Sequence, residues 1–232
     1  MCLFLTETAD SFNMDAYTQL TPNDLLQLLQ SVWVTLYVTV IALAIGTILG
    51  ILLGISRCSK NKILKYAPLI IIEPLRNSPL IVQLFLVYFG VPVLTGQVLP
   101  LYPAAIGTLA LNTAAFMAVQ VQTSILSIPR GQWEASLALG HSYASTYINV
   151  IAQQAIRILL PQAITLYISQ LMCSSLVSLL GVMDLSRLAK FTATRTMQPF
   201  LIYGIISAVY FALAYPFTKL AKSLEKRISI NL

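Results

Sequence analysis

The residues from Gly131 to Pro161 form the only extended polar interruption in the second half of the chain. Long apolar segments flank them, so any chemistry they perform takes place at a membrane surface. Pro129 suits the first turn of a short helix, and Glu134 suits its positive amino-terminal end. Gly140 is a natural helix stop, and we expect a second helix to start at Ser142.

The short helix combines two large apolar side chains with several small ones. Trp133 and Leu137 are four residues apart, so they should line one face. Ala135, Ser136 and Ala138 keep the helix narrow. A narrow amphipathic helix outside the bilayer is suited to enter a groove on another protein. A structured loop that binds nothing is the alternative.

The sequence carries no pattern typical of a catalytic or metal site. His141, the only histidine, fits a helix boundary better than a catalyst. Cys2, Cys58 and Cys173 lack paired metal-ligand spacing, so we interpret them as free thiols and expect no bound metal. No His-Glu-x-x-His pair and no Gly-x-Ser-x-Gly motif supports a membrane enzyme. A phosphate loop of the Gly-x-x-x-x-Gly-Lys-Ser/Thr type is also absent, so any ATPase must be another polypeptide.

Glu73 and Arg76 lie in the interior of an apolar segment at residues 63–93. The segment is too long for one simple span and is interrupted by Pro68, Pro74 and Pro79. Charged side chains at membrane depth are costly unless they pair or face a cavity, and broken helices usually line a pathway. Glu73 and Arg76, three residues apart, could pair across one helical face.

The elements that position these residues are transmembrane helices. Of 232 residues, 57% are hydrophobic and 9% are charged, and the mean hydropathy is +0.80. Soluble domains carry about 25% charged residues. The net charge of +6 is spread over loops, which argues against nucleic acid as a partner. We therefore predict an all-α polytopic membrane protein with spans at about 29–55, 63–93, 101–125, 158–182 and 200–217.

Basic residues orient these five helices. Arg57, Lys60, Lys62 and Lys65 follow the first span with no acid among them. By the positive-inside rule this loop is cytoplasmic, which places the amino terminus outside and the carboxyl terminus inside. The loop at 183–199 must then lie outside, although charge alone does not decide its side. The expected organisation is an extracytoplasmic tail (1–23), a transmembrane domain (24–228) containing a cytoplasmic loop (129–161), and a carboxyl-terminal tail (229–232).

Small residues recur every fourth position along the first span, at Ala42, Gly46, Gly50 and Gly54. Such a stripe allows another helix to approach closely. We expect it to be a packing face.

The cytoplasmic loop has a known counterpart. Glu134, Ala135, Gly140 and Leu160-Pro161 resemble the glutamate-alanine-alanine loop of ABC-importer permeases, with Ser136 in place of its second alanine. The resemblance implies that this loop couples the permease to an ATPase.

Two further stretches extend the resemblance. Leu75 to Pro92 and Ser175 to Val182 are similar to other permease motifs, and the run from Leu111 to Ala163 looks like the polar amino-acid branch of the family. The resemblance covers about residues 30–228. It implies the five-helix fold of type I ABC importers. It also implies a multi-pass protein in the inner membrane of a bacterium.

The resemblance also implies partners and sites. No cofactor is expected in this chain, since ATP and Mg would be bound by two separate ATP-binding subunits. The other implied partners are a second permease subunit, an extracytoplasmic amino-acid-binding protein and membrane lipids. The implied coupling residues are Trp133, Glu134, Ala135, Leu137, Gly140 and His141. The implied translocation pathway or gate comprises Glu73, Arg76, Asn77, Pro79, Gln83, Asn112, Gln122, Cys173, Ser174 and Ser175.

The chain departs from its relatives at four ionisable positions. Many relatives have a glutamate where this chain has Val119, an arginine at Gln122, and Lys-Asp at Met172-Cys173. Either a different permease subunit supplies most ligand contacts, or the ligand is bound through neutral groups. Drift at tolerant positions is the simpler explanation. A stand-alone secondary amino-acid carrier and a structural membrane subunit are the alternative functions, and the amino acid itself is not identified.

Overall fold

In the computed structural model, residues 19–229 are described, and all their regular elements are helical. The long helices are α2 (Pro22–Arg57), α7 (Leu101–Leu126), α10 (Ala152–Cys173) and α12 (Pro199–Ser229). The shorter elements are α3 (Lys62–Tyr66), α4 (Leu69–Asn77), α5 (Leu80–Phe85), the π-helix η1 (Leu86–Gly90), α6 (Val91–Thr95), α8 (Arg130–Ala138), α9 (Tyr143–Thr146), the π-helix η2 (Tyr147–Ile151), the 3₁₀ helix η3 (Ser174–Leu179) and α11 (Leu185–Thr196).

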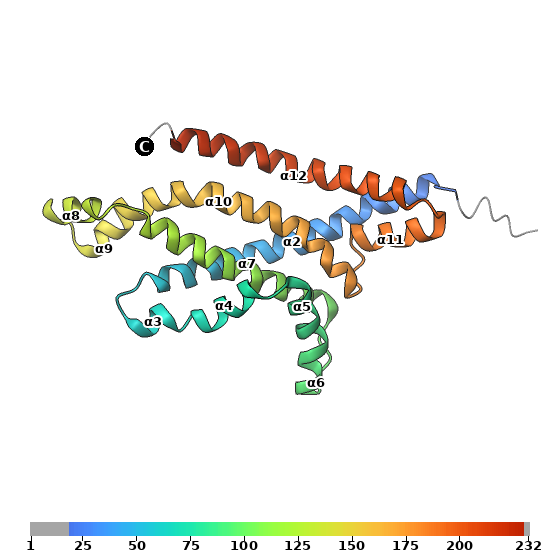
Figure 1. The fold of residues 1–232 in the computed structure, drawn as a ribbon, viewed down its shortest axis with the longest axis horizontal. Helices are drawn as coiled ribbons and strands as arrows, with labels where there is room; N and C mark the ends of the chain where they lie inside the picture. Colours follow the sequence, from blue (N-terminus) through green and yellow to red (C-terminus); the bar gives the residue numbers. More distant parts are fainter. Residues whose placement is uncertain (1–18, 230–232) are drawn as a thin grey trace, which may run out of the picture.

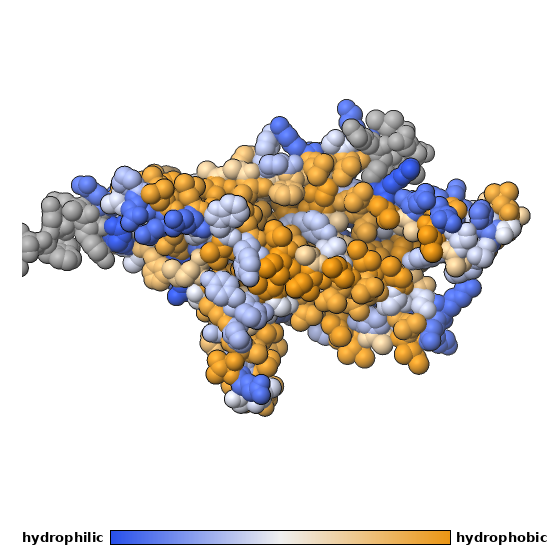
Figure 2. Space-filling view, turned by 180° about the vertical axis from the view of Figure 1, so that it is seen from behind, coloured by the Kyte–Doolittle hydropathy of each residue, from blue (hydrophilic) through white to orange (hydrophobic). Residues whose placement is uncertain are grey.

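Four helical stretches are long and apolar enough to cross a membrane, at 22–57, 101–126, 143–179 and 199–226. A fifth span is formed if the pair 62–77 and 80–95, bent by 111°, is counted as one broken crossing. The long helices lie roughly side by side (Figure 1). Apolar side chains cover the middle of the molecule and hydrophilic ones gather at its two ends (Figure 2). Five spans are therefore present, one of them broken as expected.

Three span boundaries differ from the sequence prediction. The last helix continues to Ser229 rather than ending near residue 217, because its charged end stays helical beyond the apolar part. The first helix begins at Pro22 rather than near residue 29, because Thr21 and Asp24 form a capping box that starts it early. The fourth helix begins at Tyr143 rather than near residue 158. There α9 continues through η2 into α10 without a break, so hydropathy marks only the apolar part of a longer helix.

The contact between α2 and α7 depends on the predicted stripe of small residues. All four residues of the stripe are buried. A Cβ atom added at Gly50 would stand 2.5 Å from the Cβ of Met117 and 2.8 Å from the carbonyl oxygen of Ala114. Gly46 and Gly54 are equally crowded against α7. The two backbones are therefore close enough that only glycine fits between them.

The chain breaks between α4 and α5, at Ser78 and Pro79. Both residues have extended backbone angles, as expected for a proline and the residue before it. Beyond the break, α5, η1 and α6 point away from the bundle (Figure 1).

The side of the loop at 183–199 follows from the position of α11. Arg195, in the last turn of α11, forms a salt bridge with Asp24 in the first turn of α2. Figure 1 shows α11 beside the start of α2, and α8 and the carboxyl end of α12 at the opposite end of the bundle. The loop thus lies at the same end of the bundle as the start of α2, the end that the basic loops predict to be outside.

Asp184, between α10 and α11, is fully buried. Its Oδ1 accepts a hydrogen bond from the Arg187 backbone N–H at 2.9 Å and so caps α11. Its Oδ2 has no hydrogen-bond partner. Burial favours the neutral acid and raises the pKa of Asp184 to about 6, although the backbone N–H groups and Arg187 act against the shift.

Replacement of Gly50 by alanine should destabilise the protein by about 1–3 kcal/mol, because the new methyl group overlaps Met117. Gly107 in α7 is the matched control, since a Cβ there meets nothing within 4 Å. Gly107→Ala should be neutral or slightly stabilising, because alanine is the better helix former. The thermal unfolding temperatures of both variants in detergent test this. Equal effects would argue against close backbone packing.

Stability should depend on pH through Asp184. Its folded pKa lies above the unfolded value, so its contribution is fully present below about pH 4, falls as the pH rises towards 6, and is constant above that. The loss amounts to roughly 3 kcal/mol at most. Asp184→Asn keeps the capping oxygen and cannot ionise. The unfolding temperature of the variant minus that of the parent should therefore increase from about pH 4 to pH 7. A difference that does not change with pH would contradict the raised pKa of Asp184.

Candidate functional site

The polar loop folds into a helical hairpin made of α8 and α9. Gly140 turns the chain with φ +86°, which is readily adopted by glycine. Ser142 caps α9 by accepting a hydrogen bond from the backbone N–H of Ser145. Between the two helices, the hydroxyls of Ser136 and Thr146 lie 3.0 Å apart, and both residues are buried. The predicted stop at Gly140 and start at Ser142 are confirmed.

Trp133 points into the hairpin. Its ring centroid lies 5.2 Å from that of Tyr143 and 6.0 Å from that of Tyr147. Leu137, predicted to share a face with Trp133, is 43% exposed, and Leu139 is 82% exposed. Both residues belong to α8 and are four residues apart, as the predicted shared face requires, but the tryptophan joins the two helices of the hairpin while Leu137 stays open to a partner.

The other coupling residues suggested by the sequence lie on the surface of the hairpin. Glu134, Ala135, Gly140 and His141 are exposed. Glu134 is the fifth residue of α8 and lies beyond its first turn, so the expected pairing with the amino-terminal dipole is wrong. His141 Nδ1 lies 3.1 Å from the Ser145 hydroxyl, consistent with its expected role at a helix boundary. Among residues 19–229, no group of three side chains suits a metal.

Three amide side chains form a buried chain of hydrogen bonds at the break between α4 and α5. Gln170 of α10 donates to Asn112 Oδ1 at 2.7 Å, and Asn112 of α7 donates to Gln83 Oε1 at 3.1 Å. Gln83 of α5 in turn donates to the carbonyl oxygens of Leu75 and Ser78. This amide relay of Gln83, Asn112 and Gln170 therefore holds the backbone carbonyls freed by the break.

Gln83 and Asn112 were placed in the pathway by the resemblance, and the structure buries both in the relay. Gln170 was not singled out. Its signal was an amide in the middle of an apolar span, which must find a partner there.

The other predicted pathway residues of the broken helix, which are Glu73, Arg76, Asn77 and Pro79, do not form one cluster. Glu73 accepts a hydrogen bond from the Asn77 amide at 2.9 Å. The Arg76 guanidinium lies over the Phe116 ring, 5.7 Å from its centroid. The suggested Glu73–Arg76 pair is therefore wrong: within residues 19–229 the salt bridge found is the one between Asp24 and Arg195. Pro79 sets the bend.

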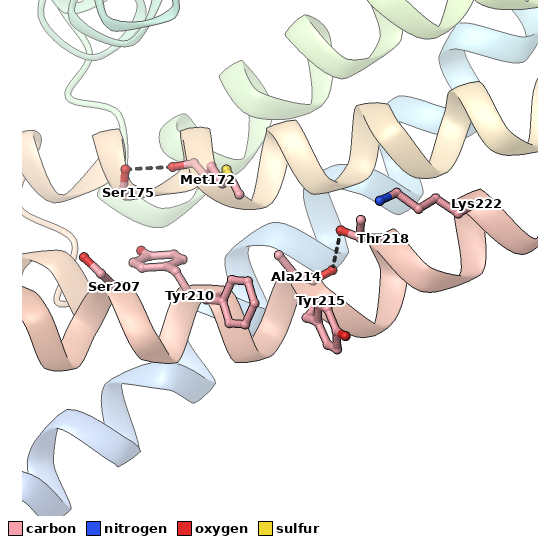
Figure 3. A pocket seen from close by; sticks show the side chains of 9 residues that line it. Met172, Ser175, Ser207, Tyr210, Ala214, Tyr215, Thr218 and Lys222 are labelled. Atoms are coloured by element: carbon pink, nitrogen blue, oxygen red, sulfur yellow. Dashed lines mark hydrogen bonds between the residues drawn. The ribbon is translucent and has the colours of Figure 1, made fainter.

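A groove of about 680 Å³ lies between α10 and α12. Its walls bring side chains of the two helices face to face (Figure 3). The lining residues are Met172, Ser175, Ser207, Tyr210, Phe211, Ala214, Tyr215, Thr218 and Lys222. Lys222 is the single charged member of this set, so the wall is neutral apart from its one cation.

Of the proposed pathway residues, only Ser175 lines this groove. Ser174 is buried and donates to the Leu171 carbonyl, and Cys173 and Gln122 are partly buried elsewhere. The α12 wall was missed. Its signal was the recurrence of Ser207, Tyr210, Thr218 and Lys222 at helical spacing in an apolar span.

Comparisons with known proteins agree with this architecture. Residues 46–230 match the family described as binding-protein-dependent transport system inner membrane component. The chain is 29% identical to the L-cystine transport system permease protein TcyB of Bacillus subtilis, covering 89% of this chain and 91% of that protein. It is 33% identical to the L-cystine transport system permease protein TcyL of Bacillus subtilis, covering 85% of each. A crystal structure of an amino acid ABC transporter with histidines superposes with a TM-score of 0.80 at 33% identity, covering 87% of this chain and 94% of that one.

Asn112→Leu should destabilise the protein by about 1–3 kcal/mol for each amide left unpaired, because Gln83 and Gln170 both lose their partner inside the bundle. Gln153→Leu on α10 is the control, since Gln153 is exposed. Unfolding temperatures in detergent give the comparison. If both variants unfold alike, the relay does not support the broken helix.

Proposed function

The chain belongs to the family of binding-protein-dependent transport system inner membrane components, and from this premise we propose that it is the permease subunit of an ATP-driven importer of polar amino acids. The observation that carries the proposal is the exposed, internally braced hairpin of α8 and α9 at one end of a transmembrane bundle. A braced helical surface outside the bilayer is suited to dock into a partner protein. Relatives of similar length named for amino-acid transport support the substrate class.

The energy source is a pair of separate ATP-binding subunits. The sequence has no phosphate loop, so ATP and Mg are bound by those subunits, and this chain catalyses no reaction. An extracytoplasmic binding protein delivers the amino acid to the end that carries α11. The complex lies in the inner membrane of a bacterium.

The hairpin is connected directly to the pathway. From α9, the helix runs through η2 and α10 to Cys173, and the next residues include Ser175 in the wall of the groove. A push on the hairpin therefore moves one continuous helix rather than a flexible loop. Alternating access requires this kind of movement of one group of helices against another.

The groove between α10 and α12 forms this subunit's wall of the pathway. Hydroxyl groups on a membrane helix are better placed against a polar path than against lipid. Since Lys222 is the single charged residue of the wall, most charged contacts with the ligand come from the second permease subunit, which we propose is a different chain.

Glu134→Lys should reduce ATP hydrolysis coupled to transport at least tenfold, because it reverses a charge on the docking face of the hairpin. The measurement is ATPase activity of the complex purified through this chain and placed in lipid discs. Glu225→Lys is the charge-matched control, an exposed acid at the same end of the bundle but on α12 rather than on the hairpin, and it should retain activity. If no ATPase accompanies the parent chain, the importer assignment fails and a stand-alone carrier or structural subunit replaces it.

A further inference from the structure

The segment between α2 and α4 gathers positive charge at the end of the bundle that carries the hairpin. Arg57, Lys60, Lys62 and Lys65 fall within nine positions, and no acid occurs from residue 57 to residue 72. The three lysines are exposed, and within residues 19–226 no salt bridge neutralises them. Such a concentration of cations beside a membrane attracts anionic groups.

The same segment also exposes apolar side chains. In α3, Ile63 is 74% exposed and Tyr66 is 55% exposed. Asn61 caps this short helix through the Ile63 backbone N–H. Exposed apolar groups next to exposed lysines are typical of a helix that lies at the membrane–water boundary, with its apolar atoms among acyl chains and its ammonium groups among headgroups.

The basic segment contacts the hairpin through one cation. The Lys60 ammonium lies 4.4 Å from the centroid of the Tyr143 ring, and Tyr143 packs against Trp133. A cation over an aromatic face is an attractive contact. Lys60 therefore joins the basic segment to the aromatic centre of the hairpin.

We propose that residues 57–66 bind the headgroup of an anionic phospholipid, with Lys62 and Lys65 holding its phosphate. Lys60 transmits the position of this lipid-bound segment to the hairpin through Tyr143. Charge complementarity selects the ligand, because the segment has four cations and no anion. The bound lipid holds the segment at the membrane surface and so steadies the hairpin for docking; this regulatory part rests on the proposed coupling function.

The binding test uses the purified full-length complex in lipid discs of phosphatidylcholine with added phosphatidylglycerol. Lipids retained by the protein after detergent extraction are counted by native mass spectrometry. The parent should retain phosphatidylglycerol in preference to phosphatidylcholine. In the double variant Lys62→Gln/Lys65→Gln, the ratio of retained phosphatidylglycerol to retained phosphatidylcholine should fall by on the order of tenfold or more. The control Lys219→Gln/Lys226→Gln removes the same charge from α12 and should keep it.

Two results would overturn the site: a parent without preference for the anionic lipid, or an equal loss in the control, which would indicate a general effect of net charge. The link to the hairpin is tested separately. In the parent, phosphatidylglycerol should stimulate ATP hydrolysis, because the bound lipid steadies the hairpin. Lys60→Gln should retain the lipid through Lys62 and Lys65 yet lose this stimulation, and Lys60→Arg should keep it, because a guanidinium also stacks on tyrosine. Unchanged stimulation in Lys60→Gln would overturn the link. Lipid retention can be read even if no ATPase accompanies the chain, so failure of the importer assignment is distinguishable.

Discussion

The close approach of α2 and α7 is the contact on which the rest of the structure depends. Gly46, Gly50 and Gly54 leave no room for a Cβ atom against α7. Lipid is as apolar as a leucine side chain, so membrane helices gain little from hydrophobic burial and are held by close packing instead. With α2 fixed on α7, the other face of α7 is free to receive α4 and α10. The stripe thus sets the position of the broken helix and, through α10, of the groove.

Breaking a helix inside a membrane frees backbone carbonyls that water cannot reach. Here the amide relay of Gln83, Asn112 and Gln170 takes up those of Leu75 and Ser78. The relay joins three helices that are far apart in sequence, so it ties the broken span to both α7 and α10. A chain of neutral amides satisfies these groups without the desolvation cost of buried charges. This fits the scarcity of ionisable residues in the spans.

The two helices of the hairpin are held together by an aromatic side chain that points inward. Trp133 packs against Tyr143 and Tyr147, and the hydroxyls of Ser136 and Thr146 form a second contact between α8 and α9. This leaves Glu134 and Leu137 for a partner to contact. Since α9 continues through η2 into α10, the proposed docking surface and the groove are joined by one continuous helix.

Amino-acid order alone determined the class of protein, the number of spans, the glycine packing face, the interruption of the second span by prolines and the hairpin turn at Gly140. Each depends on local chemistry: hydropathy over one helix, spacing along one helix, or the conformational limits of proline and glycine. Only the tertiary structure decided that Trp133 faces inward, that Glu73 and Arg76 do not form an ion pair, that Gln170 completes the relay, and that α12 lines the groove. These depend on which helices become neighbours. Helical spacing shows which residues share a face, but it does not show which helix packs against that face.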